Sequence, residues 1–98
     1  MNPILELYSR LGESLKSMGI EESVLPMSAA NSALDIYEAN NNLVLGGDIY
    51  IKKSSRSFEL LYANWFYERG NIEDSINKAR GYLKQFNGKD LYVSFVLK

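Results

Sequence analysis

The sequence predicts an α+β fold in which helices pack on a three-stranded antiparallel sheet. Apolar residues recur every three or four positions in three segments and every second position in three others. These segments follow one another in the order helix, helix, strand, strand, helix, strand, with no repeat and no long linker. Because 98 residues support one hydrophobic core, we expect a single domain over residues 1–98.

The first two helices are predicted from residue spacing and from their end signals. Asn2 is expected to cap the first helix, whose apolar side would continue to a stop at Gly19 and would hold Ile4, Tyr8, Leu11, Leu15 and Met18. After Pro26, Ser28 is expected to cap a second helix that ends in an asparagine run at residues 40–42. One side of this helix would hold Ala30, Ala33, Leu34 and Tyr37.

Residues 43–53 and 57–63 alternate with a period of two, which predicts a β-hairpin. We expect the turn at Ser54 and Ser55, and a slip of the register by one residue is the alternative. The expected cross-strand pairs are Lys53 with Arg56, Ile51 with Phe58, Ile49 with Leu60 and Gly47 with Tyr62.

The third helix and the last strand follow the hairpin. Asn71 and Asp74 have the spacing of a capping box, and the apolar positions of the helix are Ile72, Ile76, Ala79, Leu83 and Phe86. Residues 91–97 alternate again and are expected to lie antiparallel beside the first strand, which would make that strand central.

The two faces of the predicted sheet differ in character. The inner face would hold Ile49, Ile51, Phe58, Leu60, Val93 and Phe95. The outer face would hold Asp48, Tyr50, Glu59, Leu61, Tyr92 and Val96, and it is apolar enough to serve as a docking surface if no helix covers it.

The two halves of the chain carry opposite charge. Residues 1–50 hold seven acids and two bases, whereas residues 51–98 hold five acids and nine bases. Either the halves pair internally or an acidic face is offered to a basic partner. The bases form no clustered stripe, so we do not expect nucleic-acid binding.

Composition also bears on location and chemistry. No apolar run is long enough to cross a membrane and no secretion signal is visible, so we expect a cytoplasmic protein. The chain has no histidine and no cysteine, which removes the commonest general base, the thiolate nucleophile and the usual soft metal ligands. We therefore expect no enzymatic activity and neither a metal nor a cofactor.

The strand at residues 43–51 contains Gly46, Gly47 and Asp48, all of which weaken strands. We interpret the glycines as packing positions, with the Tyr62 ring lying over Gly47, and a direct ligand role is the alternative. Asp48 must pair or face water. A partner's lysine or arginine would satisfy it, and so would Asn64 or a basic side chain of this chain.

Four aromatic residues follow within residues 62–67. Phe66 is expected to close the core. Trp65 and Tyr67 would then lie on the opposite side, where large amphipathic rings anchor protein interfaces.

The hairpin carries a family resemblance. The run Leu45-Gly46-Gly47-Asp48-Ile49-Tyr50, the later Asn64-Trp65-Phe66-Tyr67 and the helix at residues 72–86 resemble the immunity protein 40 family of bacterial polymorphic toxin systems. The resemblance covers about residues 30–88. It implies a small α+β cytoplasmic protein, encoded beside a toxin, that protects the producing cell by blocking the toxin's effector domain. The positions that match the family are Gly46, Gly47, Asp48, Tyr50, Asn64 and Trp65.

Two functional hypotheses follow. In the first, the chain binds a toxin effector domain, such as a nuclease with a basic surface, and covers its active or substrate-binding surface. The expected partner-binding residues are Asp35, Glu38, Asp48, Tyr50, Trp65 and Tyr67, and the structural residues are Gly46, Gly47, Tyr62 and Asn64. In the second, the chain is a homo-oligomeric structural or regulatory module that pairs its outer face through Tyr50, Leu61 and Tyr92.

Overall fold

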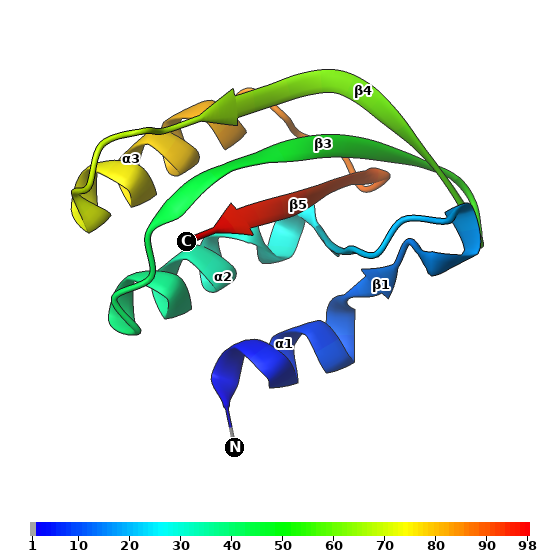
Figure 1. Cartoon of the computed structure of the whole chain (residues 1–98). Coiled ribbons are helices and arrows are strands. Elements are labelled where there is room, and N and C mark those ends of the chain that lie inside the picture. The colour runs from blue at the N-terminus through cyan, green and yellow to red at the C-terminus, as the bar shows by residue number, and fades with distance from the viewer. Residues whose placement is uncertain (1) are drawn as a thin grey trace.

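The computed structural model of the chain describes residues 2–98, which form helices and one antiparallel sheet (Figure 1). The helices are α1 (Pro3–Leu11), α2 (Ala30–Ala39) and α3 (Ile72–Leu83), with short 3-10 turns η1 (Lys16–Met18) and η2 (Met27–Ala29). The strands are β1 (Glu13–Ser14), β2 (Ser23–Pro26), β3 (Val44–Ser54), β4 (Ser57–Phe66) and β5 (Leu91–Leu97). The predicted α+β class is confirmed.

The sheet has the order β1-β2-β5-β3-β4, with every neighbouring pair antiparallel. The prediction of three strands was wrong, because β1 and β2 extend the sheet beyond β5. The central place of the glycine-bearing strand is confirmed, since β3 pairs with β4 on one side and with β5 on the other.

The three helices share the main core with one face of the sheet. In Figure 1 α2 lies beneath β5 and β3, and α3 lies beneath the end of β4. The core between them contains Leu34, Tyr37, Ile49, Ile76 and Val93, all buried. No helix within residues 2–98 has the length and apolar character needed to cross a bilayer.

The first helix is shorter than its apolar spacing predicts. It begins at the Asn2 cap as expected, but Gly12 adopts an extended conformation and the helix ends at Leu11. The apolar spacing predicts too long a helix because Leu15 also fits the recurrence of apolar residues every three or four positions. Leu15 instead enters a second core on the other face of the sheet and is fully buried.

The other two helices follow the prediction more closely. The expected apolar side of α2 is buried, although η2 leads into the helix and no Ser28 cap forms. At the start of α3 the Asn71 side chain accepts a hydrogen bond from the Asp74 N–H at 2.9 Å, which confirms the cap.

The hairpin is shifted by one residue from the expected register. Ser54 pairs with Ser57, so the turn falls at Ser55 and Arg56. Further along, the register is irregular between the Tyr50–Leu60 pair and the Asp48–Asn64 pair, because residues 61–63 lie opposite Ile49 alone. The assignment of Phe58 and Leu60 to the inner face was wrong, because a one-residue slip reverses every side chain of a strand.

Residues 13–22 cover part of the outer face. Leu15 packs with Val24, Tyr50, Phe58 and Tyr92 in the second core. Several contacts fasten this cover to the hairpin: Lys52 Nζ lies 2.8 Å from Glu13 Oε2, the Ser17 hydroxyl donates to the Arg56 carbonyl at 3.3 Å, and the Phe58 N–H donates to Met18 Sδ at 3.3 Å. The outer face is therefore open over only part of its area.

Candidate functional site

Gly47 is a packing position, but Trp65 rather than Tyr62 covers it. Gly47 pairs with Trp65 across the hairpin, and a Cβ atom at Gly47 would lie 2.6 Å from Trp65 Cη2. It would also overlap the backbone carbonyl oxygen of Ser94. The predicted cover by Tyr62 was wrong, because the irregular stretch of β4 turns that side chain outward, where it is 90% exposed.

Gly46 is restricted by its backbone surroundings. It has a φ of 157°, and a Cβ atom there would overlap the carbonyl of Trp65 on the neighbouring strand. The register with β5 is irregular between Val44 and Gly46, which is typical of a β-bulge. Both glycines therefore allow β3 to approach its neighbours closely.

The aromatic run after the bulge is oriented opposite to expectation. Trp65 is 6% exposed and packs on the rings of Tyr82 and Phe95, with centroid distances of 5.3 and 6.1 Å. Tyr67 is also buried, whereas Phe66 is 66% exposed. Trp65 Nε1 and the Tyr67 hydroxyl find no hydrogen-bond partner within residues 2–98. Within residues 65–67, Phe66 is therefore the aromatic side chain available to a partner, although the sequence pattern assigned it to the core.

Tyr50 lies on the outer face as expected, but the cover formed by residues 13–22 leaves it 4% exposed. Burial raises the pKa of the Tyr50 phenol, and the nearby carboxylates of Glu22 and Asp48 raise it further. The surface expected to pair two copies of the chain is also inaccessible for the most part, since Tyr92 is buried beside Tyr50 and Leu61 packs against the main core.

The acids on α2 lie on the helical side of the molecule. Asp35 is exposed and forms an ion pair with Arg80, which also donates a hydrogen bond to the Asn31 side chain at 2.8 Å. Glu38 is exposed in the last turn of α2. Like the contact between Glu13 and Lys52, the Asp35–Arg80 pair joins the acidic half of the chain to the basic half. These ion pairs within the molecule therefore neutralise part of the opposite charge of the two halves.

Asp48 lies in the open part of the outer face. Its Cα partners are Asn64 on β4 and Ser94 on β5. In the adjoining row Gly46 lies between Phe66 and Val96, and Val96 is 44% exposed. Asp48 is half-buried and forms no ion pair with any residue in the described range 2–98.

We call this surface the open face. It comprises the outward side chains of the uncovered rows, Asp48, Asn64, Phe66 and Val96, together with Tyr62 in the irregular part of β4 and the exposed Leu60 just before it. Sequence reasoning placed Asp48 and Val96 on this face and missed Leu60 and Phe66. The exchange of Trp65 and Phe66 follows from the irregular register at residues 61–63, which places Trp65 opposite Gly47.

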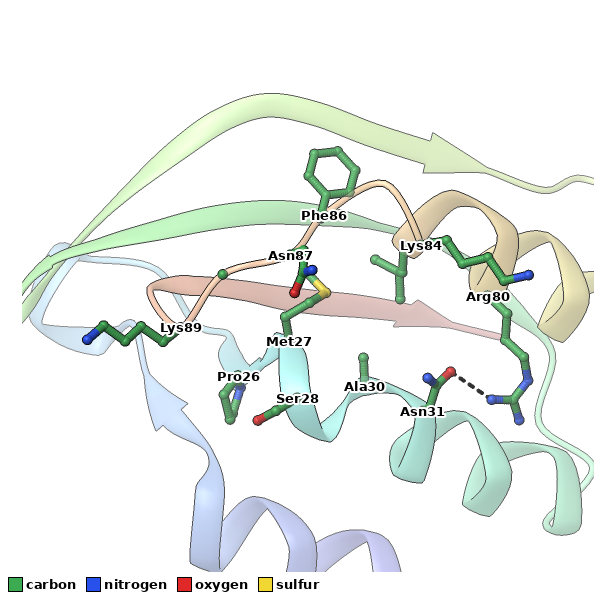
Figure 2. A pocket seen from close by; sticks show the side chains of 12 residues that line it. Pro26, Met27, Ser28, Ala30, Asn31, Arg80, Lys84, Phe86, Asn87 and Lys89 are labelled. Atoms are coloured by element: carbon green, nitrogen blue, oxygen red, sulfur yellow. Dashed lines mark hydrogen bonds between the residues drawn. The ribbon is translucent and has the colours of Figure 1, made fainter.

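A cavity of about 510 Å³ lies on the helical side, between the start of α2 and residues 83–89 (Figure 2). Met27, Ala30 and Leu83 line it, with Lys84 and Lys89 at its ends. In Figure 2 both lysines extend away from the centre of the cavity, and Arg80 points to Asn31. In an anion site the positive groups converge on a common point. The two lysines and Arg80 do not converge in this cavity.

The chain was compared with known protein families, curated proteins and solved structures. No curated protein and no solved structure matches the chain. A family model described as Immunity protein 40 matches residues 14–97, from within β1 to the last residue of β5. The matched region contains both glycines, the second core and the whole open face. Because the match spans most of the sequence, the chain belongs to the immunity protein 40 family.

Proposed function

We propose that the chain neutralises a cognate toxin by binding its effector domain and covering the active or substrate-binding surface. The observation that carries this proposal is the family match over residues 14–97. In this role the chain acts by occupying a surface, without catalysis, inside the cell that makes the toxin. A rigid sheet that presents exposed polar and aromatic side chains suits such a task.

The electrostatics favour a basic effector domain, such as a nuclease. An enzyme that binds nucleic acid needs a positive surface for phosphates, and an acidic inhibitor can occupy that surface. Glu13 and Asp35 are used in internal ion pairs, so the attraction would come from acids such as Asp48 and Glu22. Both of these lie close enough to the Tyr50 phenol to raise its pKa.

Among the six residues expected to bind a partner, Asp48 remains in our proposed interface. Trp65 and Tyr50 are enclosed by the two cores, and Tyr67 is also buried. The α2 acids offer a competing location on the other side of the sheet.

Co-expression tests the proposal. The first step is to determine whether a neighbouring gene encodes a large secreted protein with a variable C-terminal domain. That domain should then stop growth when expressed alone. Growth should return when this chain is expressed with it, and calorimetry on the purified proteins should give a one-to-one complex. If the chain neither restores growth nor binds, the proposed function is wrong. Loss of nuclease activity in the complex would support the nuclease assignment, whereas an effector with another activity would refute it.

A further inference from the structure

We infer that the open face receives a basic segment of the cognate toxin, with Asp48 pairing with its lysine or arginine and Phe66 and Tyr62 anchoring the contact. The inference rests on the proposed function. It adds to that function the face of the sheet that binds and the chemistry of the group that is bound.

The side chains of the open face are arranged in rows across the sheet. Phe66, Gly46 and Val96 form one row across three strands, and Asn64, Asp48 and Ser94 form the next. Side chains of one row lie close together on the same face of a sheet. Because Gly46 contributes no side chain, the first row consists of two exposed apolar groups beside a carboxylate.

The open face carries an unbalanced negative charge at Asp48. Asp48 stands in the middle of a strand that pairs on both sides, where a carboxylate loses part of its hydration. Within residues 2–98 its side chain has no ion-pair partner, unlike Glu13, Asp35 and Glu59. The Glu22 carboxylate adds negative charge near the same Tyr50 phenol. A partner's cation would satisfy the charge that the fold leaves unbalanced.

Large side chains on β4 are exposed to solvent. Tyr62 and Phe66 are among the most exposed apolar residues in the described part of the chain, and aromatic rings of this kind dominate protein interfaces. Lys78 Nζ lies 5.7 Å from the centre of the Phe66 ring. Because the chain's own lysine already lies beside this ring, Phe66 would contribute apolar contact area, and the toxin's cation would pair with Asp48.

A second copy of this chain fits the open face less well. Two copies that met face to face with the two-fold axis close to Asp48 would bring their Asp48 carboxylates together, and like charges in a buried contact oppose association. Nor does β4 offer a continuous edge for strand pairing. It is interrupted at residues 61–63, where Tyr62 has a left-handed φ of 56°.

The test uses the full chain and its cognate effector domain, with calorimetry for the dissociation constant and stopped-flow mixing for the association rate. Asp48→Lys and Glu38→Lys make the same charge change on opposite sides of the sheet. We expect Asp48→Lys to raise the dissociation constant at least about tenfold and to slow association, with Glu38→Lys within about twofold of the wild type. Asp48→Asn keeps the shape of the side chain and should weaken binding about threefold or more, so the test stands even if Asp48→Lys fails to fold.

A second arm removes the aromatic anchor. Phe66→Ser should weaken binding at least about tenfold, because an interface anchor carries much of the affinity. Unchanged binding by Asp48→Asn and Phe66→Ser would overturn the inference, and so would a loss confined to Glu38→Lys. A wild-type dimer by light scattering that Phe66→Ser dissociates would identify a second copy as the occupant and would also overturn it. In each of these outcomes the wild-type chain still restores growth in the co-expression experiment, so the proposed function stands. If the wild-type chain neither restores growth nor binds the effector domain, the proposed function itself is wrong.

Discussion

Gly47→Ala tests the arrangement on which the central strand depends. The new methyl group would lie 2.6 Å from Trp65 Cη2 and would overlap the Ser94 carbonyl oxygen, so both the ring and the backbone of β5 must move. Overpacking of this kind costs roughly 1–3 kcal/mol, and two overlaps place the cost near the top of that range. Replacing glycine by alanine within a strand returns about 0.5–1 kcal/mol. We therefore expect a net loss of about 2 kcal/mol, or roughly 10 °C in midpoint temperature.

The assay combines thermal unfolding followed by circular dichroism with intrinsic fluorescence. Trp65 is the single tryptophan of the chain, so its emission reports directly on the ring that Gly47 supports. The emission of Gly47→Ala should shift to longer wavelength as the ring is displaced toward water.

Gly81→Ala provides the matched control. Gly81 lies inside α3 with no atom near the position of a Cβ, so alanine should stabilise the protein by about 1 kcal/mol through helix propensity. The two substitutions add the same methyl group and should have opposite signs. If Gly47→Ala were as stable as the wild type with unchanged emission, the pairing of Gly47 with Trp65 would be refuted.

Three further predictions concern the core, the bulge and the phenols. Ser75→Ala removes the hydroxyl that accepts from the buried Val44 N–H at 3.2 Å, so urea unfolding should show a loss of about 1–3 kcal/mol; an unchanged midpoint would contradict this. Tyr62→Asn relieves a left-handed conformation that asparagine tolerates, so the unfolding free energy should rise by about 0.5–1 kcal/mol, and a fall would show that the ring is needed for packing. Burial raises the pKa of the Tyr8 and Tyr37 phenols, and their mutual hydrogen bond raises that of Tyr37 further. Because the folded state holds these protons more tightly, stability should be constant below about pH 10 and should fall above it. Urea midpoints measured from pH 8 to alkaline pH check this. The Tyr8→Phe, Tyr37→Phe double variant should reduce the fall, and the part that remains comes from Tyr50 and Tyr92, whose pKa values are also raised by burial.

The elements predicted well are those with strong local signals. The apolar side of α2 and the Asn71 cap of α3 were readable because both depend on residues within a few positions of one another. The central place of β3 followed from its length and from the strand that returns after α3. By contrast, β1 and β2 contain two and four residues, too few to show a period. β2 pairs with β5, which is distant in the sequence, and β1 pairs with β2.

The errors at the candidate site have one physical origin. The two extra residues between the Leu60 and Asn64 pairings carry no sequence marker, yet they move Trp65 into register with Gly47. Asp48 was placed correctly because alternation within β3 persists from Asp48 to Tyr50, whereas the positions of Trp65 and Phe66 were exchanged. A tertiary feature thus decided which aromatic ring meets solvent.

The place of β5 has a consequence for how the protein forms during translation. This strand is the last described element in the sequence, but it lies between β2 and β3 in the sheet. Until residues 91–97 have left the ribosome, β2 has no partner on that side and the main core lacks Val93. Such non-local pairing slows folding and leaves apolar surface exposed in the incomplete chain. A nascent chain that lacks β5 therefore cannot form the complete sheet or close the main core.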